Sequence, residues 1–248
     1  MSVLLLRLAG PLQAWGMTSR HNVRGTRTSP TKSGVVGMLA SALGRPRGAD
    51  LSDLASLDFG VRIDQPGVLV VDYHVVTAAS RSADPALQRL PTAAGASLPP
   101  KDSTKVTRRH YLADAVFVAA FGGPDIERLA EALRMPRHPL YLGRRSCPPS
   151  RPVLMDVTGH TSVTTALEQA EWQAGHAERR RHRDQDHVRL EVILDDIEGD
   201  DVLTDLPVLS LPSQRRFGSR RTRHTRVSLP VRPKPSAQPP HDPMDLLG

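Results

Sequence analysis

The 248-residue sequence is poor in aromatic residues and cysteine and contains no long apolar run. Aromatic residues make up only 4% of the chain, so the core must consist mainly of Leu, Val and Ala, and aromatic surfaces for stacking should be scarce. The single cysteine, Cys147, excludes an internal disulfide framework and a zinc site with several thiolates. No segment approaches the ~18 consecutive apolar residues of a membrane-spanning helix. We therefore expect a soluble, cytoplasmic protein without a membrane partner.

Positive charge is in excess and is unevenly distributed. The formal net charge is +7. Residues 20–32, 101–111, 137–151 and 213–226 together hold 18 of the 33 Lys and Arg with a single acid, so the rest of the chain is net acidic. If folding brings these four windows together, they form a groove that attracts phosphates and releases counterions on binding. The alternative is four separate solvated loops. This segregation of charge is the first indication of an RNA-binding protein.

The first 150 residues have the pattern of a small α+β fold. Ser29 can cap the first helix, with Pro30 at its first position. Gln65-Pro66-Gly67 is a turn signal that predicts a hairpin between two strands. The expected order is β-α-β-β-α-β, the ferredoxin-like (RRM-like) arrangement shared by many RNA-binding domains. The expected strands are Ser2–Ala9, Phe59–Asp64, Val68–Thr77, Val106–Phe121 and Leu140–Leu142, and the expected helices are Pro30–Leu43 and Asp125–Met135.

Two regions fall outside this arrangement. Ala78–Lys105 is rich in Ala, Ser, Pro and Gly and has no periodicity, which predicts a long insertion or protruding arm that reaches to about residue 107. Beyond Pro148-Pro149, a strand, a helix and a strand are predicted at Val153–Val157, Val163–Trp172 and Val188–Leu194. The expected units are a domain at 1–150 that carries the insertion, a smaller β-rich C-terminal subdomain at 151–229, and a disordered proline-rich tail at 230–248.

The start of the first helix is the best local candidate for a phosphate site. Free backbone N–H groups and the helix dipole favour an anion at this end of a helix. Thr31-Lys32-Ser33-Gly34 is not the phosphate loop of a nucleoside triphosphatase, because a Walker loop places its glycines before the lysine. The residues expected to contact nucleic-acid phosphates here are Arg24, Arg27, Lys32 and Ser33.

Other polar clusters are better explained without a ligand. The predicted strands lack the aromatic residues of a common RNA-recognition motif, so loops and the arm should hold the RNA, and Tyr73 and Tyr111 should be core or hairpin residues. The His and Arg residues at 176–187 predict a solvated loop, because neighbouring cations weaken a metal site, and RNA contact by these arginines is the alternative. The acids at 195–201 predict an exposed turn, and the Arg-rich run at 213–226 fits either a solvated face or an RNA contact. We expect no metal and no cofactor.

Metal-independent ribonuclease chemistry would need a base, an acid and a cation around one phosphate. Arg109, His110 and Tyr111 supply these residue types. Consecutive residues of a strand point to opposite faces, however, so the three side chains cannot all converge. We therefore expect no enzymatic activity, and a ribonuclease remains the alternative.

Four ordered motifs within about the first 155 residues match a known family. They are LLLRLAGPLQAWG at 4–16, Arg27-Thr28 leading into PTKSGVVGMLASALG at 30–44, RRHYLADAVFVAAFGG at 108–123, and HPLYLGRRSCPPSRP at 138–152. Together they resemble the CasD subunits of type I-E CRISPR Cascade complexes, which serve antiviral defence.

That resemblance implies a ferredoxin-like body with an extended thumb, which binds the 5′ handle of the CRISPR RNA and caps one end of the Cascade backbone. It implies contact with the backbone subunit and with the large subunit, with target DNA nearby in the assembled complex. The insertion, continuing into Arg108-Arg109, matches the position of the thumb. Type I-C relatives cut precursor RNA themselves, whereas type I-E members leave cutting to another subunit. The expected RNA-binding residues are Arg20, Arg24, Arg27, Lys32, Ser33, Lys105, Arg108, Arg109, Arg144 and Arg145.

Overall fold

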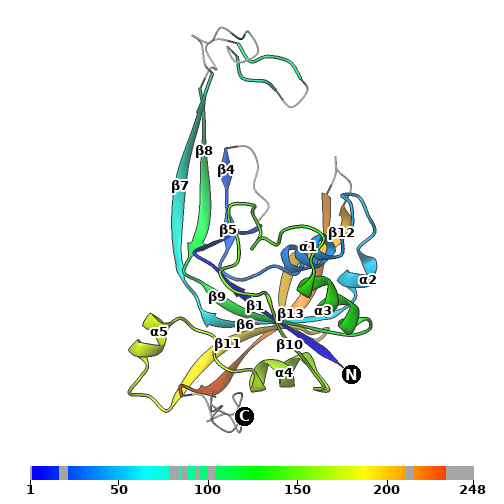
Figure 1. The fold of residues 1–248 in the computed structure, drawn as a ribbon, viewed down its shortest axis with the longest axis vertical. Helices are drawn as coiled ribbons and strands as arrows, with labels where there is room; N and C mark the ends of the chain where they lie inside the picture. Colours follow the sequence, from blue (N-terminus) through cyan, green and yellow to red (C-terminus); the bar gives the residue numbers. More distant parts are fainter. Residues whose placement is uncertain are drawn as a thin grey trace, which may run out of the picture.

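A computed structural model describes residues 2–16, 22–78, 84, 89–92, 95–99, 104–210 and 215–232. The described residues form a seven-stranded sheet in the order β10-β1-β9-β6-β11-β13-β12, in which every neighbouring pair is antiparallel. A long two-stranded arm projects from this body (Figure 1). The strands of the main sheet are β1 (Val3–Ala9), β6 (Asp58–Gln65), β9 (Val116–Gly122), β10 (Leu154–Thr158), β11 (His187–Asp195), β12 (Asp201–Ser210) and β13 (Arg215–Pro230).

Helices cover both faces of the central strands. Because successive side chains of a strand alternate between faces, Leu4 and Leu6 of β1 join one apolar cluster and Val3 and Leu5 join another. The first cluster includes helices α1 (Lys32–Ala42), α2 (Ser52–Ala55) and α3 (Ile126–Arg134), and the second includes α4 (Val163–Gln169). A fifth helix, α5 (His176–Arg181), buries none of its residues. The sheet is thus enclosed around β1 and β9.

The predicted α+β class is confirmed as a mixed α/β fold built mostly from antiparallel strands. Four of the strands come in the chain order β1, β6, β9 and β10, with α1 between β1 and β6 and α3 between β9 and β10. In the sheet, these four strands lie side by side as β10-β1-β9-β6. The predicted strand at Leu140–Leu142 is wrong. Leu142 is instead the buried anchor of a loop: its N–H donates to Cys147 O (2.8 Å) and its carbonyl accepts from Ala14 N (3.0 Å). β10 occupies the sheet position next to β1.

The sheet is continuous across residue 150, where a domain boundary was expected. β10 pairs with β1, and β11 pairs with β6, so strands that follow this position flank β1, β9 and β6 on both sides within one sheet. The expected tail begins inside the fold, because Pro230 pairs with His187 and Val231 is buried. Residues 233–248 lie outside the described residues.

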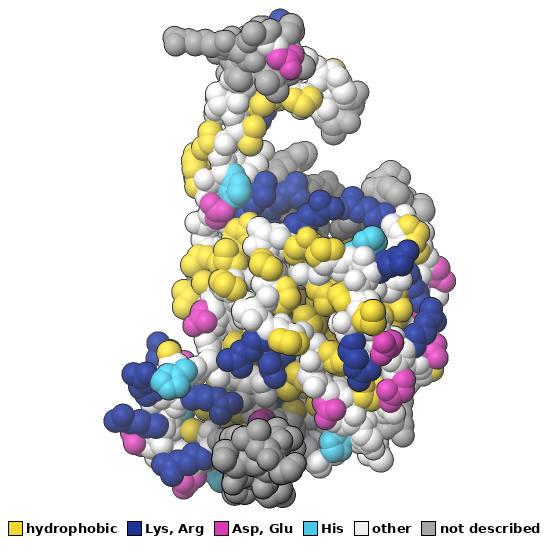
Figure 2. All heavy atoms as spheres, in the orientation of Figure 1, with side chains coloured by type: hydrophobic (Ala, Val, Ile, Leu, Met, Phe, Trp, Pro, Cys, Tyr) yellow, Lys and Arg dark blue, Asp and Glu magenta, His cyan; other side chains and the backbone are white. Residues whose placement is uncertain are grey.

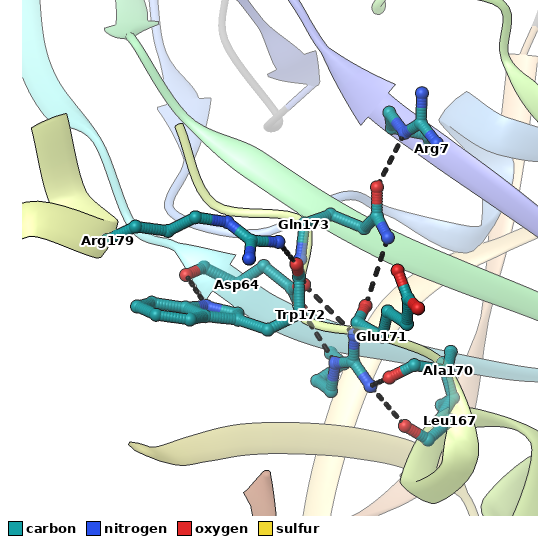
Figure 3. A network of polar contacts seen from close by, with 9 residues as sticks. Arg7, Asp64, Leu167, Ala170, Glu171, Trp172, Gln173 and Arg179 are labelled. Carbon is teal, nitrogen blue, oxygen red and sulfur yellow. Dashed lines mark hydrogen bonds and ion pairs between the residues drawn. The ribbon is translucent and has the colours of Figure 1, made fainter. Parts of the chain in front are cut away.

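A buried ion pair on β6 fastens the segment after α4 to the sheet (Figure 3). Arg62 is 0% exposed and forms two hydrogen bonds with Asp64, at 2.6 and 2.9 Å. The same guanidinium donates to the carbonyls of Leu167, Ala170 and Glu171, where α4 ends. A cation at this end of a helix also complements the helix dipole. Burial raises the pKa of Asp64, and Arg62 acts in the opposite direction.

Trp172 and Gln173 extend this network. Trp172 Nε1 donates to Asp64 O (2.9 Å), and Gln173 N donates to Asp64 Oδ2 (2.5 Å). Arg179 of α5 donates to Trp172 O, and its Cζ atom lies 5.4 Å from the centroid of the Trp172 ring. The predicted solvated loop at 176–187 is therefore corrected to a short helix that is anchored through Arg179, followed by a turn. Trp172 lies beyond α4, whose last residue is Gln169.

The arm consists of β7 (Val68–Thr77) and β8 (Thr104–Ala113), paired from Val68–Ala113 to Thr77–Thr104. The predicted hairpin between β6 and β7 is wrong, because β6 pairs with β9 and β11 and the chain leaves the main sheet at Gly67. Gly67 has φ +71, and a Cβ atom there would lie 2.5 Å from Ala113 O. The predicted continuous strand Val106–Phe121 is likewise split at Asp114 (φ 55). The expected insertion lies largely outside the described residues.

Candidate nucleic-acid interface

A small sheet at the foot of the arm brings distant basic residues together. β2 (Leu12–Gln13) pairs with the end of β8, and β4 (Val23–Arg24) runs parallel to its middle. The register partners in this parallel pair are Val23 with Arg108, and Arg24 with Arg109. Figure 2 shows a band of Lys and Arg side chains that begins at the foot of the arm and crosses the body. The foot of the arm thus brings basic residues of two of the sequence windows together.

Arg24 and Arg109 place like charges side by side. Register partners project from the same face of a sheet, where like charges are destabilising. Among the described residues, no carboxylate forms an ion pair with either guanidinium. The Nε atom of Arg109 is buried and has no hydrogen-bond partner among the described residues. An anionic ligand would relieve this repulsion and supply the missing acceptor.

Arg144 holds the strands of this surface in place. Its Nη1 atom donates to His110 O on β8 (3.0 Å). Its Nη2 atom donates to the carbonyls of Arg24 (3.0 Å) and Gly25 (3.1 Å). The guanidinium also lies over the ring of Tyr111, 4.7 Å from its centroid. Because five fixed N–H groups suit several acceptors at once, an arginine is well fitted to this clamp.

The structure does not assemble the ribonuclease candidates. Arg109 and Tyr111 share one face of β8, whereas His110 projects from the other. Tyr111 is buried beneath Arg144, with its hydroxyl 3.3 Å from Ser146 Oγ, so it is a core residue as predicted. Tyr73 is different: it is exposed on β7 in the antiparallel β7–β8 arm, so it is a hairpin residue and not a core residue. The side chains of Arg109, His110 and Tyr111 therefore do not converge on one face of β8.

The remaining predicted residues lie in several environments. Arg27 is half-buried on β5 (Thr26–Arg27), which pairs with β3 (Trp15–Gly16), and Arg145 is exposed in the loop that carries Arg144. Lys105 is half-buried on β8, and Ser33 is half-buried in the first turn of α1. Arg20 lies outside the described residues.

Lys32 is buried and is bound within the protein. It is 4% exposed, and its Nζ atom donates to Asp195 Oδ2 (2.7 Å) and to Leu57 O (2.7 Å). The helix start is also occupied, because Lys32 N donates to Asp205 Oδ2 (2.8 Å). The cap is Thr31 rather than Ser29, since Thr31 Oγ1 accepts from Gly34 N (3.2 Å). The protein thus provides its own anion at the site predicted for phosphate.

Arg220 completes this internal network. It pairs with both Asp195 and Asp205, and although burial acts in the opposite direction, the two carboxylates raise the pKa of Arg220. Asp195 is therefore part of a structural ion network and not of an exposed acidic turn. Three of the four basic windows meet at the foot of the arm through Arg24, Arg109 and Arg144. The fourth lies on β13, in the main sheet.

The described residues contain no cluster of three or more His, Cys, Asp or Glu side chains that could hold a metal ion. Nor is any helix within the described part of the chain long and apolar enough to cross a membrane. Cys147 is buried, and burial raises the pKa of its thiol.

Comparisons with known proteins agree with the resemblance of the four motifs. Residues 3–223 match the family described as CRISPR-associated protein (Cas_Cas5). A curated relative, the CRISPR system Cascade subunit CasD of Escherichia coli (strain K12), is 36% identical over 175 residues, which cover 67% of this chain and 75% of that protein.

Two solved structures are similar over nearly the whole chain. One is described as a CRISPR RNA-guided surveillance complex, with a TM-score of 0.77 and 35% identity, covering 92% of this chain and 91% of that one. The other, described as a Cas protein, has a TM-score of 0.66 and 35% identity, covering 92% and 95%. Sequence family, curated relative and fold thus agree, and the chain belongs to the Cas5 family of CRISPR-associated proteins, which includes the CasD subunit.

Proposed function

We propose that this protein is a non-catalytic, RNA-binding subunit of a type I-E CRISPR Cascade complex, which holds the 5′ handle of the CRISPR RNA for antiviral defence. One observation carries the proposal. Arg24 and Arg109 lie side by side without a carboxylate partner among the described residues, and Arg144 fixes the strands that carry them. A surface that keeps like charges together and rigid is suited to the regularly spaced phosphates of a nucleic acid.

The division into body and arm supports this function. The proposed body is ferredoxin-like and comprises β1, α1, β6, β9, α3 and β10, whose order in the sheet is β10-β1-β9-β6. The proposed thumb is the arm formed by β7 and β8. It is anchored at Gly67 and Asp114, where the chain passes between the two sheets. Basic residues of β8 and β4 lie where thumb and body meet, which is where an RNA strand would be gripped.

The proposed partners follow from the named relative and from the family resemblance. They are the CRISPR RNA, the Cascade backbone subunit that this chain would cap, and the large subunit, with target DNA nearby. The proposed location is the cytoplasm. A buried single cysteine is compatible with a reducing compartment.

Reconstitution tests the proposed role in the complex. The other Cascade subunits from the same locus are co-expressed with their CRISPR array, with and without this chain, and the product is purified through a tag on the backbone subunit. The expected result is that complexes with this chain retain full-length CRISPR RNA and the large subunit, whereas complexes without it lose both. A complete complex that forms without this chain would contradict the proposal.

Incubation with RNA tests the absence of catalysis. Purified protein in molar excess is mixed with labelled CRISPR repeat RNA and EDTA, and the RNA is expected to remain intact because Arg109, His110 and Tyr111 do not converge. A specific cut that Tyr111→Phe abolishes would favour the ribonuclease alternative instead.

A further inference from the structure

An exposed tyrosine lies next to an exposed arginine on the arm. Tyr73 on β7 is 59% exposed, and its register partner on β8 is Arg108, whose side chain is also exposed. Arg108 is in turn the register partner of Val23 on β4, which is 49% exposed. Register partners project from the same face of a sheet. The three side chains therefore form one row across β7, β8 and β4.

The surface around this row is open and apolar. Val71 and Val75 flank Tyr73 on the same face of β7, because alternate residues of a strand share a face, and both are more than half exposed. Figure 2 shows apolar side chains along the arm above the basic band. In the isolated chain, Val71, Tyr73 and Val75 leave more than half of their surface in contact with solvent. An exposed apolar patch of this kind marks a binding surface.

The nearby charges favour nucleic acid over protein as the ligand. Arg24 and Arg109 form the adjacent row on β4 and β8 and project from the opposite face, and the third member of that row is Asp72 on β7, which pairs with His74. Among the described residues, the side chain of Arg108, like theirs, has no carboxylate partner. Single-stranded RNA offers both kinds of group that such a surface needs. Its unstacked bases lie against aromatic rings and guanidinium planes, and its phosphates pair with cations.

We propose that Tyr73 and Arg108 form a stacking site for one nucleobase of the bound RNA, on the face of the arm opposite to Arg24 and Arg109. This inference rests on the proposed function, since it requires an RNA ligand. It adds a contact to a base, where the arginine pair provides contacts to phosphates. A base contact and a phosphate contact differ in their salt dependence, because only the phosphate contact releases counterions.

Binding of the full chain to labelled CRISPR RNA from its own locus tests the site. Tyr73→Leu removes the ring and keeps an apolar side chain, so the affinity should fall by about 10-fold or more, with an unchanged salt slope. Tyr73→Phe keeps the ring and should bind nearly as well as the wild type. Met135→Ala is the control: Met135 is 79% exposed at the end of α3, outside the arm, and its replacement should leave binding unchanged. Circular dichroism and thermal unfolding confirm that each variant is folded.

Abasic RNAs identify the stacked nucleotide. Removing the base at one position should weaken binding to the wild type but cause no further loss in Tyr73→Leu, because the two changes delete the same contact. Unchanged RNA affinity of folded Tyr73→Leu would overturn the stacking site. If that variant also failed to join the other Cascade subunits, the surface would be a protein-docking site. A wild-type chain that does not bind the RNA would instead overturn the proposed function, which distinguishes the two failures.

Discussion

The Nζ atom of Lys32 lies 2.7 Å from Oδ2 of Asp195, although the two residues are 163 positions apart in the chain. This ion pair joins the start of α1 to the end of β11. Arg220 and Asp205 extend it, and Asp205 also accepts from the backbone N–H of Lys32. A helix start that would otherwise attract phosphate is thus used to join α1 to the β12–β13 hairpin.

Lys32→Ala should therefore affect stability and not RNA binding. The substitution leaves Asp195 with one cationic partner in place of two, and breaking such a mostly buried pair costs about 3 kcal/mol. Urea unfolding should show this loss, while the folded fraction should bind CRISPR RNA with unchanged affinity. The control is Ser33→Ala, which should change stability by about 0.5 kcal/mol or less. A Lys32→Ala protein of normal stability that binds RNA weakly would restore the predicted phosphate contact.

The double variant Arg24→Ala/Arg27→Ala should show the opposite behaviour. Arg24 has no ion pair to lose among the described residues, and its removal relieves repulsion from Arg109, so the unfolding midpoint should remain near the wild-type value. Retention of CRISPR RNA should fall. The slope of log affinity against log salt should flatten by about 0.7 for each lost phosphate contact.

A charge-matched control separates specific contacts from net charge. Arg128→Ala/Arg134→Ala removes the same number of arginines from the exposed face of α3, outside the foot of the arm. Equal losses of RNA in the two double variants would mean that binding depends on overall charge only. That result would remove the main support for the interface.

Arg144→Lys tests the clamp. A lysine keeps the charge but cannot reproduce the hydrogen bonds to His110, Arg24 and Gly25, so the variant should be less stable by about 1.5–3 kcal/mol. RNA affinity should fall as well, because the two strands that carry Arg24 and Arg109 would no longer be held together. Arg145→Lys is the control, since Arg145 is exposed in the same loop. If both variants behaved like the wild type in thermal unfolding and RNA binding, Arg144 would have no positioning role.

Local sequence patterns predicted the elements whose structure depends on neighbouring residues. β1 was predicted because its apolar run is bounded by Gly10-Pro11, and α3 because its apolar side chains recur at helical spacing. The turn at Gly67 was also real, but turn residues do not specify which strand the next segment pairs with. β7 pairs with β8, and this choice depends on side chains that lie far along the chain. For the same reason, the sequence did not show that β10, and not the predicted strand at Leu140–Leu142, pairs with β1.

The candidate site was predicted in part for the same reason. Counting charges found the windows that contain Arg24, Arg109 and Arg144, and these windows do meet. The sequence could not show that Asp195 and Asp205 neutralise Lys32 and the helix start, because both acids lie more than 160 residues away. Nor could it show that Tyr73 is exposed, since Val71, Tyr73 and Val75 alternate with polar residues, which is the pattern of a half-buried strand.

The buried pair Arg62 and Asp64 provides the last prediction. Asp64→Ala leaves the guanidinium of Arg62 buried without a counter-charge, which costs about 3–5 kcal/mol. Since Gln173 N also donates to the Asp64 carboxylate, the loss should release the segment between α4 and α5. Limited proteolysis should then cut near Trp172 before the rest of the chain.

Glu131→Ala is the control. It breaks an exposed pair with Arg134 and should change the free energy of unfolding by about 0.5 kcal/mol or less. Similar stability of the two variants would mean that the backbone carbonyls around Arg62 suffice to hold it, and that Asp64 is not required to fasten this segment to β6.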